Sequence, residues 1–162
     1  MKIQFKSDLD HQLDAINAVV GVFEGQESFQ SNFSVGSNAM VNQQLGLFSK
    51  NSDLGVGNGL TLLPEELYEN TRHVQLLNGL PQTENAKQIL PSRDFTIEME
   101  TGTGKTYVYL RSVFELNQRY GLTKFIIVVP SVAIKEGVNK SLEITEEHFR
   151  QQYKNVQYDY FV

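Results

Sequence analysis

Apolar residues near the start of the chain recur at the spacing of one helix face. They lie three or four positions apart, which predicts an amphipathic helix. Ser7 or Asp8 is expected to cap its first amides, and Gly25 is expected to end it. Ahead of this helix, the alternation of Ile3 and Phe5 predicts a short strand. The apolar face of the predicted helix consists of Leu9, Leu13, Ile16, Val19, Val20 and Phe23.

The central part of the chain, residues 26–93, is predicted to be a polar insertion. Residues 26–63 are rich in Gln, Asn, Ser and Gly without a sustained period, which indicates a long surface excursion. A variable insertion and a functional lid both fit this composition. A helix is predicted near residues 65–78, because Pro64 suits a first helical position and acidic residues follow it. Gly79 is expected to end that helix.

In the last part of the chain, residues 94–162, the spacing of apolar residues changes from that of a strand to that of a helix and back. Residues 95–99 are strand-like, residues 105–120 are helical, and residues 124–129 are an apolar run. A strand, a helix and a second, apolar strand predict a right-handed crossover onto a parallel sheet. The alternating tail, residues 156–162, predicts a further strand. We therefore predict an α/β fold for this part.

A glycine-rich turn lies between the first predicted strand and the helix. Its two glycines allow the backbone to turn tightly, so that consecutive amides can point at an anion. The lysine brings a positive charge to phosphate oxygens, and the last threonine offers a hydroxyl to Mg²⁺ at a helix N-terminus. The pattern predicts a nucleotide phosphate loop, and the alternative is a glycine turn with an exposed lysine. The loop consists of Thr101, Gly102, Thr103, Gly104, Lys105 and Thr106.

Three neighbours of the loop depart from a simple phosphate site. Met99 stands where the longer phosphate-loop pattern has its first glycine, although helicase-like ATPases often use the shorter Thr-Gly-x-Gly-Lys-Thr form. Glu98 and Glu100 lie beside a site meant for polyphosphate, and like charges there disfavour binding. We expect both carboxylates to turn away from the phosphates or to pair with a basic side chain.

Composition limits what else the chain can be. Its 162 residues suit one domain, and the absence of cysteine excludes disulfides, thiolate zinc sites and cysteine nucleophiles. His11, His73 and His148 do not have the spacing of paired metal ligands. The formal net charge of −5 means that DNA contacts must come from local geometry. The chain shows neither a signal peptide nor an apolar run of roughly 18 residues, so we expect a cytoplasmic protein with no membrane partner.

Four segments resemble one family of DNA-processing motors. Residues 99–111, Met-Glu-Thr-Gly-Thr-Gly-Lys-Thr-Tyr-Val-Tyr-Leu-Arg, resemble motif I of the Res subunits of type III restriction-modification enzymes, which belong to helicase superfamily two. Residues 125–138 resemble motif Ia of the same family, and residues 141–149 are also similar to it. Residues 5–16 resemble the glutamine-containing helix that precedes motif I. The resemblance covers most of the chain outside residues 26–93.

The resemblance implies ATP and Mg²⁺ as cofactors and assigns residues to them. The loop residues 101–106 would bind ATP, with Thr106 holding Mg²⁺ through the nucleotide, and no catalytic residue is assigned beyond Lys105. Gln12 would correspond to the glutamine that hydrogen-bonds adenine, and the alternative is an exposed helix glutamine. Ser131 would meet a DNA phosphate or simply cap a helix. Lys135 would neutralise a second phosphate or simply be solvated.

The resemblance also implies a domain plan and a biological role. Residues 1–25 would supply a strand and the glutamine-bearing helix, and residues 94–162 the first part of a RecA-like ATPase domain. The role is that of an ATP-dependent DNA translocase and endonuclease subunit, a type III site-specific deoxyribonuclease. Its partners would be double-stranded DNA and a methyltransferase (Mod) subunit.

The second acidic ATPase motif is missing from the sequence, so we expect the chain to stop before it. Hydrolysis in such motors needs that motif and an arginine from a second lobe. We therefore expect the isolated chain to bind ATP weakly and not to hydrolyse it. Two alternatives remain open at this point. One is the motor of another superfamily-two helicase, such as a type I restriction subunit, and the other is a stand-alone nucleotide-binding regulatory module.

Overall fold

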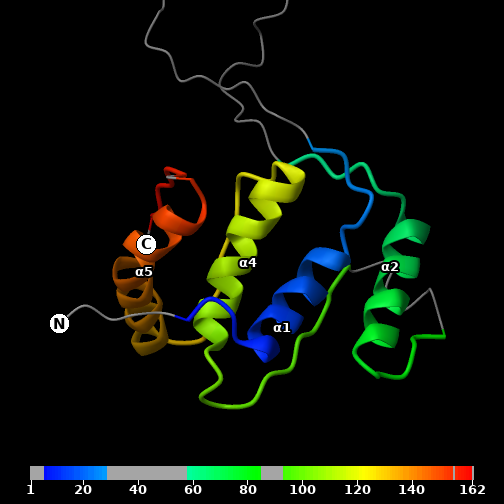
Figure 1. Cartoon of the computed structure of the whole chain (residues 1–162), viewed down its shortest axis with the longest axis horizontal. Helices are drawn as coiled ribbons and strands as arrows, with labels where there is room; N and C mark the ends of the chain where they lie inside the picture. The colour runs from blue at the N-terminus through cyan, green and yellow to red at the C-terminus, as the bar shows by residue number, and fades with distance from the viewer. Residues whose placement is uncertain (1–5, 29–57, 85–92, 155, 162) are drawn as a thin grey trace, which may run out of the picture.

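The computed structural model describes residues 6–28, 58–84, 93–154 and 156–161. Four α-helices occur within these ranges: α1 (Asp10–Gly21), α2 (Pro64–Leu77), α4 (Lys105–Tyr120) and α5 (Val132–Gln152). They lie side by side in the order α5, α4, α1, α2, so that α4 and α1 form the centre (Figure 1). None of the helices in these ranges combines the length and the hydropathy that a membrane span requires.

Helix α1 lies where the apolar pattern predicts it and packs against α4. Ile16 and Val20 are 2% and 0% exposed, and they form one cluster with Val108 of α4. The hydroxyl of Tyr120, at the other end of α4, donates to the carbonyl oxygen of Val20 at 3.0 Å. Burial of one continuous apolar face therefore fixes α1 along the length of α4.

The predicted caps of α1 are wrong. Leu9 is the N-cap and makes no side-chain cap bond, and the helix ends at Gly21. The backbone carbonyl of Ser7 instead accepts a hydrogen bond from Arg111 Nη1 of α4 at 2.5 Å. The approach to α1 is thus held by a residue of α4, and Gly25 lies in the turn that follows, with a φ of 85°.

Helix α2 begins at Pro64, as the sequence predicts. The carboxylate of Glu66 accepts a hydrogen bond from the amide of Leu63 at 2.7 Å, which satisfies a donor at the helix start. Leu67 is 2% exposed and packs in a cluster with Val22, beyond the end of α1. Helix α2 is therefore attached to the molecule through α1.

Helices α4 and α5 meet in an aromatic cluster. Phe149 of α5 is 0% exposed, with its ring centroid 4.7 Å from that of Phe114 and 5.5 Å from that of Tyr107. Helix α4 has the predicted bounds, and its C-cap is Gly121, whose φ of 69° is left-handed. The N-terminal ends of α4 and α1 lie on the same side of the molecule (Figure 1).

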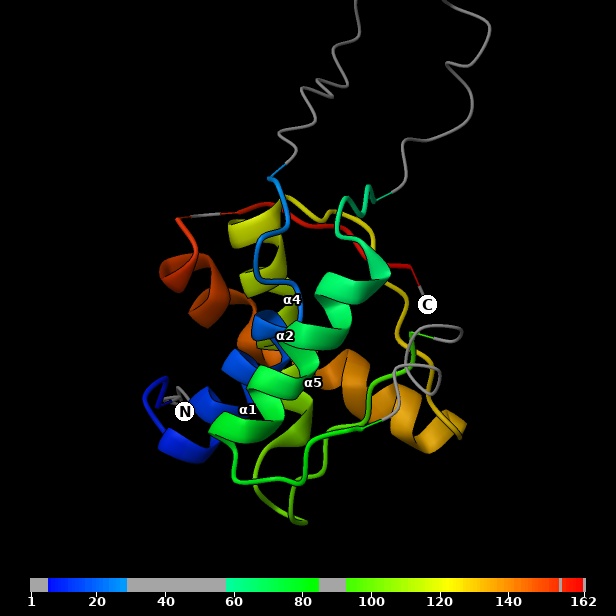
Figure 2. The same ribbon diagram turned by 90° about the vertical axis from the view of Figure 1, so that its right-hand side faces the viewer.

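The parallel sheet predicted from the sequence is not present in the described residues, so the predicted α/β class is wrong. Residues 95–99, residues 124–129 and the described tail, residues 156–161, are not strands. Ile126 and Val128 are 91% and 87% exposed, where a buried strand was expected. Figure 2 shows the chain after α4 as an irregular segment that leads to α5.

The error has a physical cause. A run of β-branched residues shows that side chains favour burial, but a strand exists only when a neighbouring backbone supplies hydrogen bonds. A sheet that is stable on its own needs three or more strands, and a parallel sheet needs cover on both faces. Helix α4 is covered here by α1 and α5 instead. The apolar pattern alone did not distinguish these arrangements.

The predicted division into residues 1–25, 26–93 and 94–162 stays a prediction. The expected strand at Ile3 and Phe5 lies outside the described residues, as do residues 29–57 and 85–92 of the insertion.

Candidate functional site

The glycine-rich loop turns into α4 through two left-handed glycines. Gly102 has a φ of 85° and Gly104 a φ of 89°, which residues with a Cβ rarely adopt. Gly104 is the N-cap of α4, and its carbonyl accepts the helix bond from the amide of Val108 at 3.0 Å. The first backbone N–H groups of a helix have no carbonyl acceptor one turn earlier. The end of this loop therefore presents hydrogen-bond donors.

The loop is also closed by its own side chains. Thr103 Oγ1 donates to the carbonyl oxygen of Glu100 at 2.7 Å, and Lys105 Nζ donates to the same oxygen at 3.0 Å. The side chain of Lys105 is exposed, whereas Thr106 is half-buried in the first turn of α4. The ammonium group of Lys105 therefore folds back over the glycine-rich loop, where a bound phosphate is also expected to lie.

Two side chains of α1 reach the loop from the other side. Gln12 Nε2 donates to the carbonyl oxygen of Thr103 at 2.9 Å, and His11 Nε2 lies 3.3 Å from the same oxygen. Gln12 is only 7% exposed, so its interpretation as an exposed helix glutamine is wrong. A Cβ at Gly104 would lie 2.5 Å from Gln12 Nε2, so the amide packs directly against the loop backbone. Sequence reasoning missed His11, because nothing local distinguishes it from a solvated histidine.

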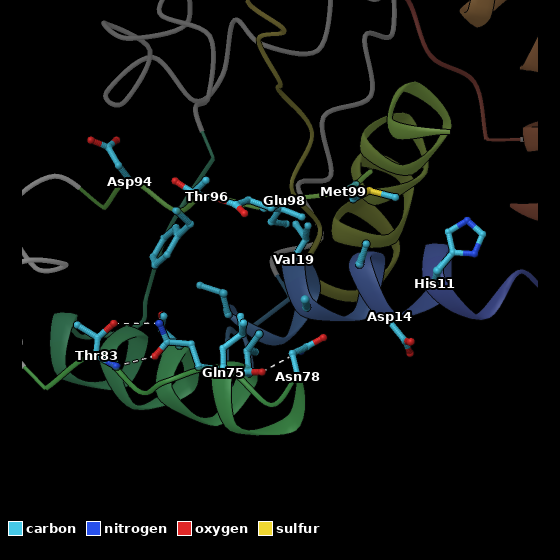
Figure 3. Close-up of a pocket in the computed structure, with 18 of the residues that line it drawn as sticks. His11, Asp14, Val19, Gln75, Asn78, Thr83, Asp94, Thr96, Glu98 and Met99 are labelled. Atoms are coloured by element: carbon cyan, nitrogen blue, oxygen red, sulfur yellow. Dashed lines mark hydrogen bonds between the residues drawn. The ribbon is translucent and has the colours of Figure 1, made fainter. Parts of the chain in front are cut away.

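A cavity of about 1060 Å³ lies beside the loop, between α1, α2 and residues 94–100 (Figure 3). Its lining includes the carboxylate-bearing residues Asp14, Asp94, Glu98 and Glu100. Carboxylates repel polyphosphate, so this cavity does not suit the phosphates of a nucleotide. Glu98 and Glu100 are exposed residues of this lining, and Glu100 serves the loop through its backbone carbonyl.

Tyr107 connects the loop to α5. Its hydroxyl lies 2.9 Å from His148 Nε2. Burial raises the pKa of Tyr107, and the positive charge of Arg111 partly opposes that rise. Burial, and then the charge of Arg111, lowers the pKa of His148. At neutral pH the contact therefore joins a protonated phenol and a neutral imidazole.

The two predicted DNA contacts lie on α5. Ser131 is the N-cap of α5, and its Oγ accepts a hydrogen bond from the amide of Ile134 at 3.3 Å. Lys135 is exposed in the first turn of the same helix. In the part of the chain that the structure describes, no hydrogen bond or ion pair joins either side chain to residues 101–106. No group of three or more histidines and carboxylates within the same part could hold a metal ion.

Two left-handed glycines, a lysine and a threonine lie together where α4 begins, which is the local geometry expected of proteins that carry a phosphate loop. Comparison with known proteins gives a more specific assignment, to a single family. The chain belongs to the family of type III restriction enzyme Res subunits, because the family model described as "Type III restriction enzyme, res subunit" matches residues 60–160. The resemblance found in the sequence is confirmed by this match.

Individual relatives are also Res subunits of type III restriction-modification enzymes. The chain is 35% identical over 152 residues to the "Type III restriction-modification enzyme EcoPI Res subunit" of Escherichia phage P1, a match that covers 93% of the chain. It is 33% identical over 154 residues to the EcoP15I Res subunit of Escherichia coli, which covers 92% of the chain. It is 54% identical over 61 residues to the StyLTI Res subunit of Salmonella typhimurium strain LT2, covering 36% of the chain and 6% of that protein. The chain spans 14% of the length of each of the first two relatives.

Proposed function

We propose that residues 101–106 bind the triphosphate of ATP with Mg²⁺, as the nucleotide site of a type III restriction enzyme Res subunit. The observation that supports this most strongly is the pair of left-handed glycines directly before α4. Such a turn lets consecutive amides face one anion, and the N-terminus of the helix adds partial positive charge. The four Res-like sequence segments and the family assignment point the same way.

The side chains of the loop fit this role. Lys105 Nζ would leave the carbonyl oxygen of Glu100 to meet the β and γ phosphates, exchanging a neutral acceptor for a charged one. The hydroxyl of Thr106, in the first turn of α4, would hold Mg²⁺ bound to the nucleotide. The metal ion would neutralise charge on the phosphates.

An NMR titration tests the loop directly. Adding ATP and Mg²⁺ to the chain should shift the amide resonances of Gly102 and Gly104, and Lys105→Ala should abolish the shift. Lys124→Ala is the matched control, since Lys124 is also exposed but lies beyond the far end of α4. The proposal fails if the loop amides stay unmoved in the folded chain, or if both lysine variants behave alike.

At the level of the whole protein, we propose an ATP-dependent DNA translocase and endonuclease that acts with a methyltransferase subunit on double-stranded DNA. The family assignment favours this over the type I motor. In the full-length subunit, Lys105→Ala should abolish ATP-dependent cleavage of DNA in the presence of the methyltransferase, and Lys124→Ala should preserve it. Equal cleavage by the two variants would refute an ATP-driven role for this loop.

The DNA contacts at Ser131 and Lys135 are proposals of the same kind. The N-terminus of α5 has a serine hydroxyl at its cap and a lysine one turn on, both exposed. If Lys135 neutralises one phosphate, Lys135→Ala should weaken DNA binding and reduce the slope of log K against log salt by about 0.9. An unchanged slope in a folded variant would show that Lys135 is solvated.

A further inference from the structure

The contact between α1 and the loop suggests a role for Gln12 that differs from reading a base. The donor nitrogen of its side-chain amide is bound to the Thr103 carbonyl oxygen at 2.9 Å, and the residue is 7% exposed. His11 adds a second nitrogen at 3.3 Å from the same oxygen and donates to it when that nitrogen carries the proton. Residues 91 positions apart in the chain thus meet at one peptide group.

The geometry of a peptide group explains why this contact matters. In a planar trans peptide the C=O and the following N–H point in opposite directions. The carbonyl of Thr103 is drawn toward α1, so the N–H of Gly104 must point away from α1. Gly104, which follows this peptide, has the conformational freedom in φ to let it rotate, and the Gln12 bond opposes that rotation.

Helix α1 is a rigid support for such a contact. Ile16 and Val20, one and two turns after Gln12, are almost fully buried in the cluster shared with α4. The same α4 begins at the loop, so both partners of the Gln12 bond are fixed to one core. An amide held by a packed helix loses little freedom when it forms its bond, which is the condition for effective pre-organisation.

We infer that Gln12, assisted by His11, is a positioning residue that holds the Thr103–Gly104 peptide in the orientation that binds phosphate. This inference rests on the proposed function of the loop. The resulting gain in affinity comes from the phosphates and is the same for every nucleotide base. A residue that read adenine would instead favour ATP over other triphosphates.

Inorganic tripolyphosphate separates the two roles, because it has the phosphates and no base. We would measure the affinities of the chain for ATP, GTP and tripolyphosphate, each with Mg²⁺, by NMR titration of the loop amides. Gln12→Ala should weaken all three by the same factor, about 3- to 10-fold, as the loss of one hydrogen bond predicts. The Gly104 amide resonance of the ligand-free variant should also move. Gln118→Ala, an exposed glutamine on α4, is the matched control and should change none of these values.

The outcomes are distinct. Circular dichroism first establishes the temperature at which each variant is folded, so that a loss of stability is not mistaken for a loss of affinity. Weaker ATP binding with unchanged tripolyphosphate binding would overturn the inference in favour of base reading. Binding that depends on Lys105 but not on Gln12 would overturn this inference alone. If the unmodified chain binds none of the three ligands, the proposed function fails and this inference fails with it.

Discussion

The two loop glycines allow a test in which similar substitutions should have different effects. Gly102 and Gly104 have nearly the same φ, 85° and 89°. A Cβ at Gly102 would meet nothing within 4 Å, whereas a Cβ at Gly104 would lie 2.5 Å from Gln12 Nε2. Gly102→Ala therefore introduces backbone strain alone, and Gly104→Ala also displaces the buried amide of Gln12.

The magnitudes follow from these contacts. A left-handed conformation costs a residue with a Cβ about 1–2 kcal/mol, which is the expected loss of stability for Gly102→Ala. Gly104→Ala adds the loss of the Gln12 bond to Thr103, about 0.5–1.5 kcal/mol, for a total of about 1.5–3.5 kcal/mol. The Gln12 side chain can swing aside, so we expect the hydrogen bond to be lost without gross disruption of α4.

Urea unfolding followed by circular dichroism measures both losses, and a double-mutant cycle isolates the Gln12 contribution. In the Gly104→Ala background the hydrogen bond is already broken, so adding Gln12→Ala should cost about 0.5–1.5 kcal/mol less than it does in the unmodified chain. Gln12→Ala should cost the same with and without Gly102→Ala. Equal losses for the two glycine variants, together with no coupling between positions 12 and 104, would refute the packing of Gln12 on the loop.

Three further predictions concern the core, a titrating histidine and the reaction. Phe149 is 0% exposed in the aromatic cluster, so Phe149→Ala should lower the free energy of unfolding in urea by about 3–5 kcal/mol, and a loss under about 1 kcal/mol would contradict that packing. Folding lowers the pKa of His148, so the folded state favours the neutral imidazole. The resulting stabilisation is fully present above the unfolded pKa of about 6.5, and it is lost as the pH falls through the folded pKa. The free energy of unfolding should thus decline more steeply between pH 7 and pH 5 in the unmodified chain than in His148→Gln, and equal slopes would show that His148 does not titrate differently on folding. The isolated chain should release no phosphate from ATP above a Lys105→Ala background, because no second acidic motif is recognised in its sequence, and robust turnover that depends on Lys105 would show this expectation to be mistaken.

Features that depend only on residues close together in the sequence could be predicted from the sequence. The starts of α2 at Pro64 and of α4 at Lys105 follow from proline and glycine chemistry, and the end of α4 follows from Gly121. The glycine loop was recognised because its requirements, flexible backbone and one cation before a helix, are met by adjacent residues. The Res family was recognised in the same way, through contiguous motifs, and the family match agrees.

Features that depend on distant partners were decided only by the tertiary structure. The strand-like residues 95–99 and the apolar run at residues 124–129 predicted strands, yet a strand requires hydrogen bonds from another backbone, and the described residues supply none. The carbonyl of Ser7 binds Arg111 in place of the predicted cap, and Gln12 binds the loop at Thr103. Each of these outcomes joins segments far apart in sequence, and local periodicity carries no information about which distant group will be in reach.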